Sequence, residues 1–210
     1  MASKTISRRL IITFSLVLLI VAAFAPHPVV AAPLAEAQAV PDLASFISSI
    51  QNGDANTLRG VYADGMFALP VVQQPPSNAG YVSTTANTVT QFSLAAQYKN
   101  VGLLAHNYLS GQYFFQLTTG ERVYLVYGDS HVQIFQITNI YRYQATDPYS
   151  TRSNFIDLET GENLTANQLF HKVYMGARHV TFQTCIANNG NSSWGRLFVI
   201  AEPVTNQAMR

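Results

Sequence analysis

The chain contains one cysteine, Cys185, and its thiol is the side chain best suited to covalent chemistry. A cysteine becomes a strong nucleophile when its surroundings favour the thiolate, because the unperturbed thiol has a pKa of about 8.5. Three interpretations of an unpaired cysteine are open: a bond to another chain, a reactive thiol, or burial as a small apolar side chain. The residues that can surround Cys185 decide between them.

Two further residues can meet Cys185 if the segments that carry them are neighbouring strands. Arg196 comes eleven residues after Cys185, beyond the polar turn 188–195, and a hairpin would place the two side by side. His106 ends the apolar run 101–105 and joins them if its strand ends at the same rim. The sequence therefore predicts a cluster of a thiol, a guanidinium and an imidazole.

The elements that must position this cluster are short strands. From about residue 91 the chain has short runs rich in β-branched and aromatic residues, separated by turn residues. This pattern predicts strands over 101–105, 113–117, 123–127, 132–143, 180–187 and 197–201. Strands do not alternate with long helices, so we expect a mainly β fold, either a barrel or a sandwich.

Three other segments have different patterns. The spacing of Leu43, Phe46, Ile47 and Ile50 predicts one apolar helix face within 40–60. Proline, glycine and asparagine residues in 71–90 predict a linker or irregular segment. A long loop is expected over 145–167, with a short helix over 164–173.

The amino terminus has the order of a secretory signal: basic residues, an apolar run, then small residues. Lys4, Arg8 and Arg9 precede the uncharged run 10–35, and cleavage after Ala32 or Ala39 fits the pattern. An uncleaved membrane anchor is the alternative, and both interpretations place the rest of the chain outside the cytoplasm. Three parts are therefore expected: a signal peptide or anchor over 1–39, a short helix and linker over 40–90, and a catalytic β-barrel over 91–210.

Composition excludes several classes of protein. The chain has 210 residues, of which 48% are hydrophobic and only 11% charged, so it can build a sizeable core and is not disordered. The net charge of +1 gives no basis for electrostatic binding of nucleic acid. We expect no nucleic-acid partner, and membrane contact only through the amino-terminal segment.

The segment Thr181-Phe182-Gln183-Thr184-Cys185 resembles the Thr-Leu-x-Thr-Cys signature of sortases, which are cysteine transpeptidases. Leu104-Ala105-His106-Asn107, followed by the turn at Gly120-Glu121-Arg122, is similar to their histidine region. The order of histidine, cysteine and arginine also matches, and the resemblance covers about residues 91–203. Phe182 replaces the usual leucine, an apolar exchange that preserves strand packing.

This resemblance implies a closed barrel of about eight strands with the three catalytic residues at its rim. Cys185 would attack the carbonyl of a Thr-Gly-type bond in a sorting signal and form a thioester acyl-enzyme. His106 would protonate the leaving amine as general acid, and Arg196 would donate hydrogen bonds to the substrate or the oxyanion. Thr184 and Trp194 are the expected substrate-binding residues.

The resemblance also implies partners. The substrates would be secreted proteins that carry a sorting signal, and the acceptor would be an amine of a cell-wall precursor or a pilin lysine. No zinc motif is present, so we expect no zinc. Some sortases bind calcium near the loop before the cysteine strand, but its carboxylates here are irregularly spaced, and solvated charges are the default: Asp147, Asp157, Glu159 and Glu162.

Two alternative functions remain open from the sequence. The same site can act as a hydrolytic cysteine peptidase with water as acceptor, or the domain can be an inactive sortase-like scaffold that binds a partner. Other cysteine enzymes of the cell wall fit less well. L,D-transpeptidases have a histidine just before the cysteine, and NlpC/P60-type peptidases place the cysteine before the histidine, the reverse of the order of His106 and Cys185.

Overall fold

A computed structural model describes residues 39–204 of the chain. The predicted signal or anchor over 1–39 therefore lies outside the described residues, apart from Ala39. Within 39–204, no helix has both the length and the apolar character needed to cross a membrane.

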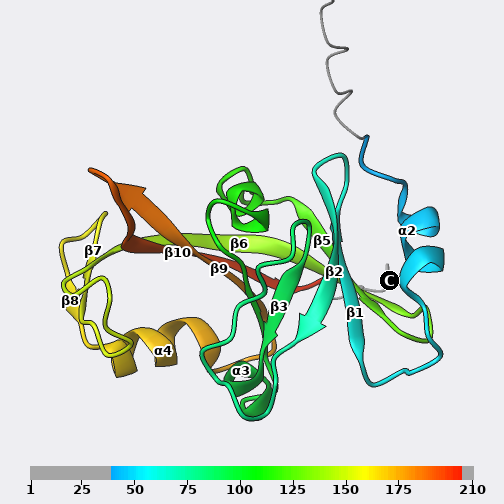
Figure 1. Ribbon diagram of the computed structural model, residues 1–210, viewed down its shortest axis with the longest axis horizontal. Helices are drawn as coiled ribbons and strands as arrows, with labels where there is room; N and C mark the ends of the chain where they lie inside the picture. The colour runs from blue at the N-terminus through cyan, green and yellow to red at the C-terminus, as the bar shows by residue number, and fades with distance from the viewer. Residues whose placement is uncertain (1–38, 205–210) are drawn as a thin grey trace, which may run out of the picture. The chain divides into compact units, whose positions relative to one another are not determined.

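Ten strands form one sheet, and eight of them close into a ring. Their order is β10-β9-β4-β3-β2-β1-β5-β6-β7-β8, and β10 also pairs with β6. This extra pairing joins eight strands into a ring, and β7 and β8 extend the sheet beyond it (Figure 1). The strands are β1 (Leu58–Ala63), β2 (Phe67–Gln73), β3 (Val89–Phe92), β4 (Val101–Leu104), β5 (Arg122–Tyr127), β6 (Val132–Ala145), β7 (Phe155–Asp157), β8 (Asn163–Leu164), β9 (Val180–Asn188) and β10 (Asn191–Pro203). The prediction of a closed barrel of about eight strands is confirmed.

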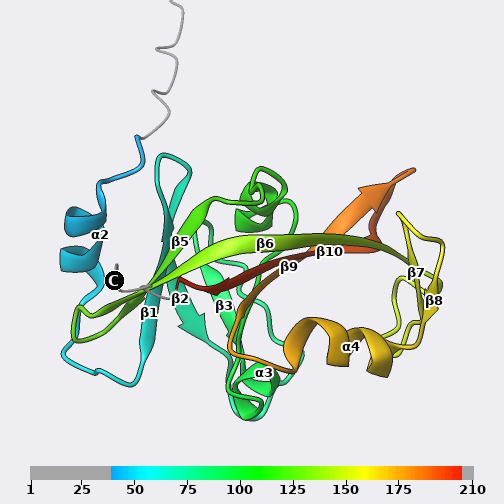
Figure 2. The ribbon, with the colours of Figure 1, turned by 180° about the vertical axis from the view of Figure 1, so that it is seen from behind.

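Most strands of the ring are antiparallel, but β4 runs parallel to β9, and β2 runs parallel to β3. The β4–β9 pairing matters for the site, because it brings the carboxyl ends of the histidine and cysteine strands to the same rim. The β9–β10 hairpin and the β7–β8 extension lie together at one end of the described unit, as both ribbon views show (Figures 1 and 2).

The barrel interior is filled by alternate side chains of the strands, as expected for a two-residue period. On β9, Val180 and Phe182 are fully buried inside, and on β10 Leu197 and Val199 point to the same core. Residues at the intervening positions face outward, where Phe198 and Ile200 pack under helix α4 (Ala166–Tyr174). Each of these strands therefore has two distinct faces, and the site lies on the outer one.

The sheet begins earlier in the chain than the sequence indicated. Helix α2 (Leu43–Ile50) forms as predicted, with the Asp42 carboxylate capping it by accepting a hydrogen bond from the Ser45 amide at 2.9 Å. Strands β1 and β2, however, lie in the part expected to be helix and linker. They close the barrel because β1 pairs with β5, a partner about 65 residues away, and such long-range pairing leaves no local signal.

The predicted strand over 113–117 is wrong. The structure has a 3-10 helix, η1 (Ser110–Phe115), in its place. The His106 carbonyl accepts hydrogen bonds from the amides of Leu109 and Gly111, both at 3.0 Å, and these bonds wind the chain before the aromatic run begins. The apolar pattern serves packing instead, because Phe114 is fully buried and its ring contacts Phe182 at 5.2 Å between centroids.

The loop expected over 145–167 contains the two short strands β7 and β8. The short helix predicted near its end is confirmed as α4, which begins with a reciprocal capping box between Thr165 and Gln168. Helix α4 and η1 lie on opposite sides of β6 and β10 (Figures 1 and 2). Helix α3 (Ser93–Gln97) lies between β3 and β4 along the chain.

Candidate functional site

Cys185 and Arg196 are direct cross-strand partners in the antiparallel pair of β9 and β10. Residues opposite each other in such a pair point to the same face of the sheet, with their Cα atoms about 5 Å apart. The face is the outer one, because the next pair on it is Gln183 and Phe198, and Phe198 packs under α4. Cys185 is half-buried and carries a free thiol.

His106 is the second residue after Leu104, which is the last residue of β4. The parallel register ends with Leu104 opposite Gln183, and the Ala105 amide continues it by donating to the Gln183 carbonyl at 3.2 Å. Ala105 belongs to the barrel core, so strand alternation places His106 on the outer face. His106 and Cys185 each come two residues after the last recorded pair, Leu104 and Gln183, so both follow the same end of the parallel pair, and all three residues, His106, Cys185 and Arg196, are half-buried.

Thr184 is 2% exposed, and its hydroxyl donates to the Ala105 carbonyl at 2.8 Å. Thr184 is two residues after Phe182 and so points to the same interior side of β9. The Thr184 hydroxyl ties the end of β4 to β9, and the contact with substrate predicted for Thr184 stays a prediction.

Gly111 allows the histidine segment to approach β9 closely. A Cβ atom at this position would lie 2.2 Å from Thr184 Oγ1 and 2.7 Å from the His106 carbonyl oxygen. Real Cβ atoms do not tolerate such distances, so any other residue would push the turn 106–111 away from β9. The close approach depends on the missing side chain and has no requirement for positive φ.

The Arg196 guanidinium is held by three backbone carbonyls. Its Nη1 donates to the Ser193 and Gly195 oxygens, both at 2.8 Å, and its Nη2 donates to the Pro148 oxygen at 3.3 Å. The first two acceptors belong to β10 itself, and the third belongs to the loop between β6 and β7. Because a guanidinium has five N–H donors, two of them remain for another acceptor.

The two residues that follow His106 in the chain, Asn107 and Tyr108, both make side-chain contacts near it. The Asn107 side-chain amide donates to the Ser192 carbonyl at 2.9 Å, which joins the histidine segment to the β9–β10 hairpin. The Tyr108 ring stacks on the His106 imidazole, with centroids 5.1 Å apart and planes 21° apart. Sequence reasoning missed both residues, although their position next to His106 was an available signal.

Trp194 is half-buried on β10. It comes two residues before Arg196 on the same strand. Its expected role in substrate binding stays a prediction. Tyr149, next to Pro148 in the β6–β7 loop, is 80% exposed and is the most exposed large apolar side chain among residues 39–204.

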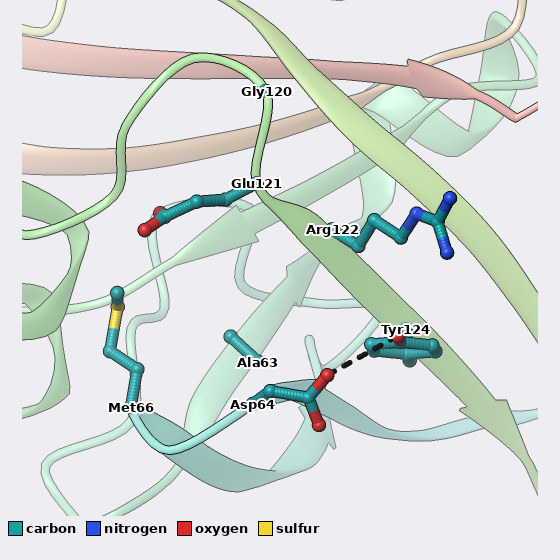
Figure 3. A pocket seen from close by; sticks show the side chains of 7 residues that line it. All are labelled: Ala63, Asp64, Met66, Gly120, Glu121, Arg122 and Tyr124. Carbon is teal, nitrogen blue, oxygen red and sulfur yellow. Dashed lines mark hydrogen bonds between the residues drawn. The ribbon is translucent and has the colours of Figure 1, made fainter.

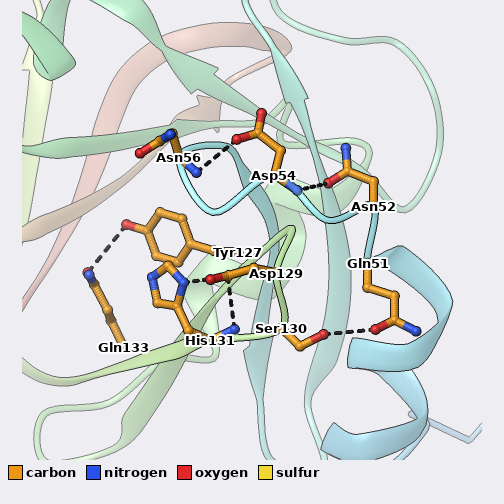
Figure 4. Close-up of polar contacts among 9 residues, drawn as sticks. All are labelled: Gln51, Asn52, Asp54, Asn56, Tyr127, Asp129, Ser130, His131 and Gln133. Atoms are coloured by element: carbon orange, nitrogen blue, oxygen red, sulfur yellow. Dashed lines mark hydrogen bonds and ion pairs between the residues drawn. The ribbon is translucent and has the colours of Figure 1, made fainter.

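Of the three other described histidines, His171 is exposed on α4, and His131 and His179 have separate structural partners. His179 is buried, and its ring nitrogens contact the carbonyls of Ala177 and Val173. His131 stacks on Tyr127 at 4.2 Å and contacts the Asp129 carboxylate, in a polar cluster near the end of α2 (Figure 4). Neither histidine lies on β4, β9 or β10 near Cys185.

The loop carboxylates do not converge on a metal site. In the part of the chain that the structure describes, no three histidine, cysteine, aspartate or glutamate side chains are grouped to hold an ion. Burial raises the pKa of Asp157, but hydrogen bonds from the Glu159 and Thr160 amides, the charge of Lys172 and the Tyr143 hydroxyl together lower it overall. The Asp157 Oδ1 atom accepts both bonds, at 2.9 and 3.1 Å, so this carboxylate orders its own turn.

A separate open cleft of about 340 Å³ lies between the β1–β2 turn and the start of β5 (Figure 3). Its lining residues do not include Cys185, His106 or Arg196. Both of its carboxylates are already engaged, since Asp64 accepts from the Tyr124 hydroxyl at 3.3 Å and Glu121 accepts from the Thr118 amide at 2.8 Å.

No protein-family model matches the chain, and no curated protein sequence matches it. Solved structures do match. Sortase C1 of GBS Pilus Island 1 is 17% identical with a TM-score of 0.46, over 70% of this chain and 65% of that one, so the match spans less than two thirds of that protein. Sortase C-1 from Actinomyces oris is 14% identical with a TM-score of 0.47, over 79% and 82% of the two chains. A lid mutant of sortase A from Corynebacterium diphtheriae is 12% identical with a TM-score of 0.45, over 72% of each chain. In its fold, this chain is similar to sortases of known structure.

Proposed function

We propose that the chain is an exported cysteine transpeptidase of the sortase type. The observation that carries the proposal is the cross-strand pair of Cys185 and Arg196 on the outer face of the barrel. His106 supports it, because it follows the end of β4, the strand that runs parallel to β9. A thiol on β9, a guanidinium on β10 and an imidazole just after β4 can supply the nucleophile, the oxyanion donor and the general acid of an acyl transfer. The amino-terminal segment supports an extracytoplasmic location, either secreted or anchored.

The first half of the proposed reaction forms an acyl-enzyme. The Cys185 thiolate attacks the carbonyl carbon of a Thr-Gly-type bond in a sorting signal, and a tetrahedral oxyanion results. When the C–N bond breaks, the leaving amine takes a proton from the His106 imidazolium. The products are a thioester on Cys185 and a free peptide that begins with the former leaving amine.

Arg196 suits the stabilisation of the oxyanion. Three of its N–H groups already bond to the Ser193, Gly195 and Pro148 carbonyls, so the guanidinium is fixed before substrate binds. The two remaining donors are available to the substrate carbonyl oxygen. A donor that is held in place in advance costs no reorganisation when the negative charge develops.

The second half transfers the acyl group. An amine attacks the thioester carbonyl, His106 accepts the proton of the attacking nitrogen, and the Cys185 thiolate leaves. We infer that the donor substrates are secreted proteins with a sorting signal and that the acceptor is a cell-wall precursor or a pilin lysine. With water as the acceptor, the same site would act as a hydrolytic peptidase.

Product analysis tests this proposal. The full chain is incubated with a pool of Thr-Gly-containing peptides, with and without an added primary amine, and the products are identified by mass spectrometry. Amide products that contain the added amine and that disappear in Cys185→Ala support the transpeptidase. Hydrolysis products alone, at every amine concentration, would contradict it and favour the peptidase. If Cys185→Ala retains full biological activity, the domain is a scaffold and both enzymatic interpretations fail.

A further inference from the structure

We propose that Tyr108 is a positioning residue for His106 and that its ring holds the imidazole in the orientation needed for proton transfer. This inference rests on the proposed function, because it assigns Tyr108 to the same site. The observation that carries it is the stacked contact between the two rings, at 5.1 Å and 21°.

Burial in the core does not account for the position of the Tyr108 ring. The residue is 67% exposed, so most of its apolar surface remains in water. An exposed tyrosine side chain usually moves freely, because holding it in one position costs conformational entropy. The contact that orders this ring is the one with His106.

The backbone holds Tyr108 over the imidazole. The His106 carbonyl accepts from the Leu109 and Gly111 amides, both at 3.0 Å, which closes the turn that carries Tyr108. On the other side of His106, the Thr184 hydroxyl fixes the Ala105 carbonyl. The turn that carries Tyr108 is therefore held by hydrogen bonds before and after His106.

Asn107 adds a link to the strand pair that bears the nucleophile. Its side chain donates to the Ser192 carbonyl at 2.9 Å, across 85 residues of sequence, and Ser192 lies in the hairpin between Cys185 and Arg196. The histidine turn and the hairpin thus move together. Movement of the turn as a whole is restricted by Asn107, and rotation of the imidazole within it is restricted by Tyr108.

Stacking is a suitable way to orient the His106 imidazole, because a hydrogen bond to a ring nitrogen would occupy an atom that proton transfer requires. His131 and His179 are oriented by hydrogen bonds to their ring nitrogens. A general acid and base must keep a ring nitrogen free for the substrate proton. Stacking on Tyr108 orients the ring through its face and leaves its edge, where both nitrogens lie, available.

The test compares Tyr108→Phe with Tyr108→Leu in the full chain. Phenylalanine keeps the ring without the hydroxyl, and leucine keeps an apolar side chain without the ring. The matched control is Tyr98→Leu, the same exchange at a tyrosine that is 39% exposed and contacts Phe170 instead. Two readouts are measured: the NMR resonances of the His106 ring, assigned with His106→Gln, and the kcat and KM of peptide cleavage.

In the wild type and in Tyr108→Phe, the aromatic ring current is expected to shift the His106 ring protons upfield, with kcat retained. In Tyr108→Leu those resonances move downfield and kcat falls about 10- to 100-fold, the cost of a misplaced catalytic group, while KM and Tm stay unchanged. Unchanged resonances and an unchanged kcat in Tyr108→Leu would overturn the inference. Equal losses of kcat in the Phe and Leu variants would also overturn it, because the hydroxyl rather than the stacking would then be responsible.

The two readouts separate this inference from the proposed function. If the wild-type chain cleaves no Thr-Gly peptide, the proposed function fails, and the NMR comparison still decides whether the Tyr108 ring stacks on His106 in solution. If cleavage occurs but the resonances do not depend on the ring at position 108, only the positioning role fails.

Discussion

The Thr184 hydroxyl donates a hydrogen bond to the Ala105 carbonyl at 2.8 Å. These two residues come immediately before Cys185 and His106 in the chain, so one buried hydrogen bond joins the strand ends from which both side chains project. Because Thr184 is 2% exposed, the bond is protected from competition with water. The spacing between the thiol and the imidazole therefore depends on a residue that faces the barrel interior.

Replacing Thr184 with valine tests this bond. Valine has nearly the same shape but no hydroxyl, which leaves the Ala105 carbonyl without its donor in a buried place. We expect Thr184→Val to lower the free energy of unfolding by about 1–2 kcal/mol in urea titrations and to lower kcat as well. Thr184→Ser keeps the hydroxyl and should retain most of the activity. Equal kcat values for the Val and Ser variants would show that the bond does not position the site.

Gly111 should not tolerate a larger residue. In Gly111→Ala the new Cβ would lie 2.2 Å from Thr184 Oγ1 and 2.7 Å from the His106 oxygen, so the turn must shift. Overpacking of this kind costs about 1–3 kcal/mol of unfolding free energy, and the displaced His106 should also reduce activity. The matched control is Gly80→Ala, where the nearest atom is 3.7 Å away and a change below about 0.5 kcal/mol is expected. Similar effects at both glycines would contradict the close-packing argument.

Arg196 should be required for turnover and not replaceable by lysine. Removal of an oxyanion donor costs about 10²–10³ in kcat, and we expect Arg196→Ala to fall in that range. Lysine keeps the charge but lacks the planar set of donors that bonds to three carbonyls here, so Arg196→Lys should recover little. The control is Arg142→Ala, an exposed arginine on the neighbouring strand β6 opposite Leu197. Full activity in Arg196→Lys would show that only charge matters at this position.

Asp157 should make the stability of the chain depend on acidity. Burial raises its pKa, but the two amide hydrogen bonds, with the nearby Lys172 charge and Tyr143 hydroxyl, lower it by more, so its folded pKa lies below the ordinary value of 3.8. A carboxyl group with a lowered folded pKa contributes stability above pH 3.8, and this contribution is lost as the pH falls through the folded pKa. Urea titrations of the wild type and Asp157→Asn should therefore differ most at neutral pH and converge in strong acid. A constant difference at all pH values would show that ionisation of Asp157 does not contribute.

Much of this arrangement could be predicted from local sequence. The strand that ends at Cys185 and the strand that begins near Arg196 are separated by a polar turn, so their pairing as a hairpin is the simplest arrangement. The placement of Thr184 was also available from alternation, because Phe182 is an apolar residue two positions earlier and shares its face. The substrate-binding role predicted for Thr184 rests on its sequence position next to the nucleophile, whereas the structure shows its side chain buried and bonded to the Ala105 carbonyl.

Other features could not be predicted, because they depend on contacts between distant segments. Strand β1 has Gly60 in its middle, where Phe46 and Ile50 of α2 pack directly over the backbone. A Cβ atom added at Gly60 would lie 2.4 Å from Ile50 Cδ1, so the glycine leaves room for the helix. The apolar run at Phe114 has strand-like composition but winds into η1, since its place is set by packing on Phe182. The bond between Asn107 and Ser192 likewise joins segments that only the folded barrel brings together.

The central claim is that Cys185 forms a thioester with a Thr-Gly-containing peptide, and its most direct test is the intact mass of the full chain. The chain is mixed with the peptide pool without added amine, quenched in acid, and analysed by mass spectrometry with fragmentation. The proposal predicts an adduct equal to the peptide segment up to its threonine, located on Cys185 and absent from Cys185→Ala. It also predicts that added amine removes the adduct. The absence of any adduct at Cys185, in a preparation whose thiol still reacts fully with an alkylating agent, would contradict the account.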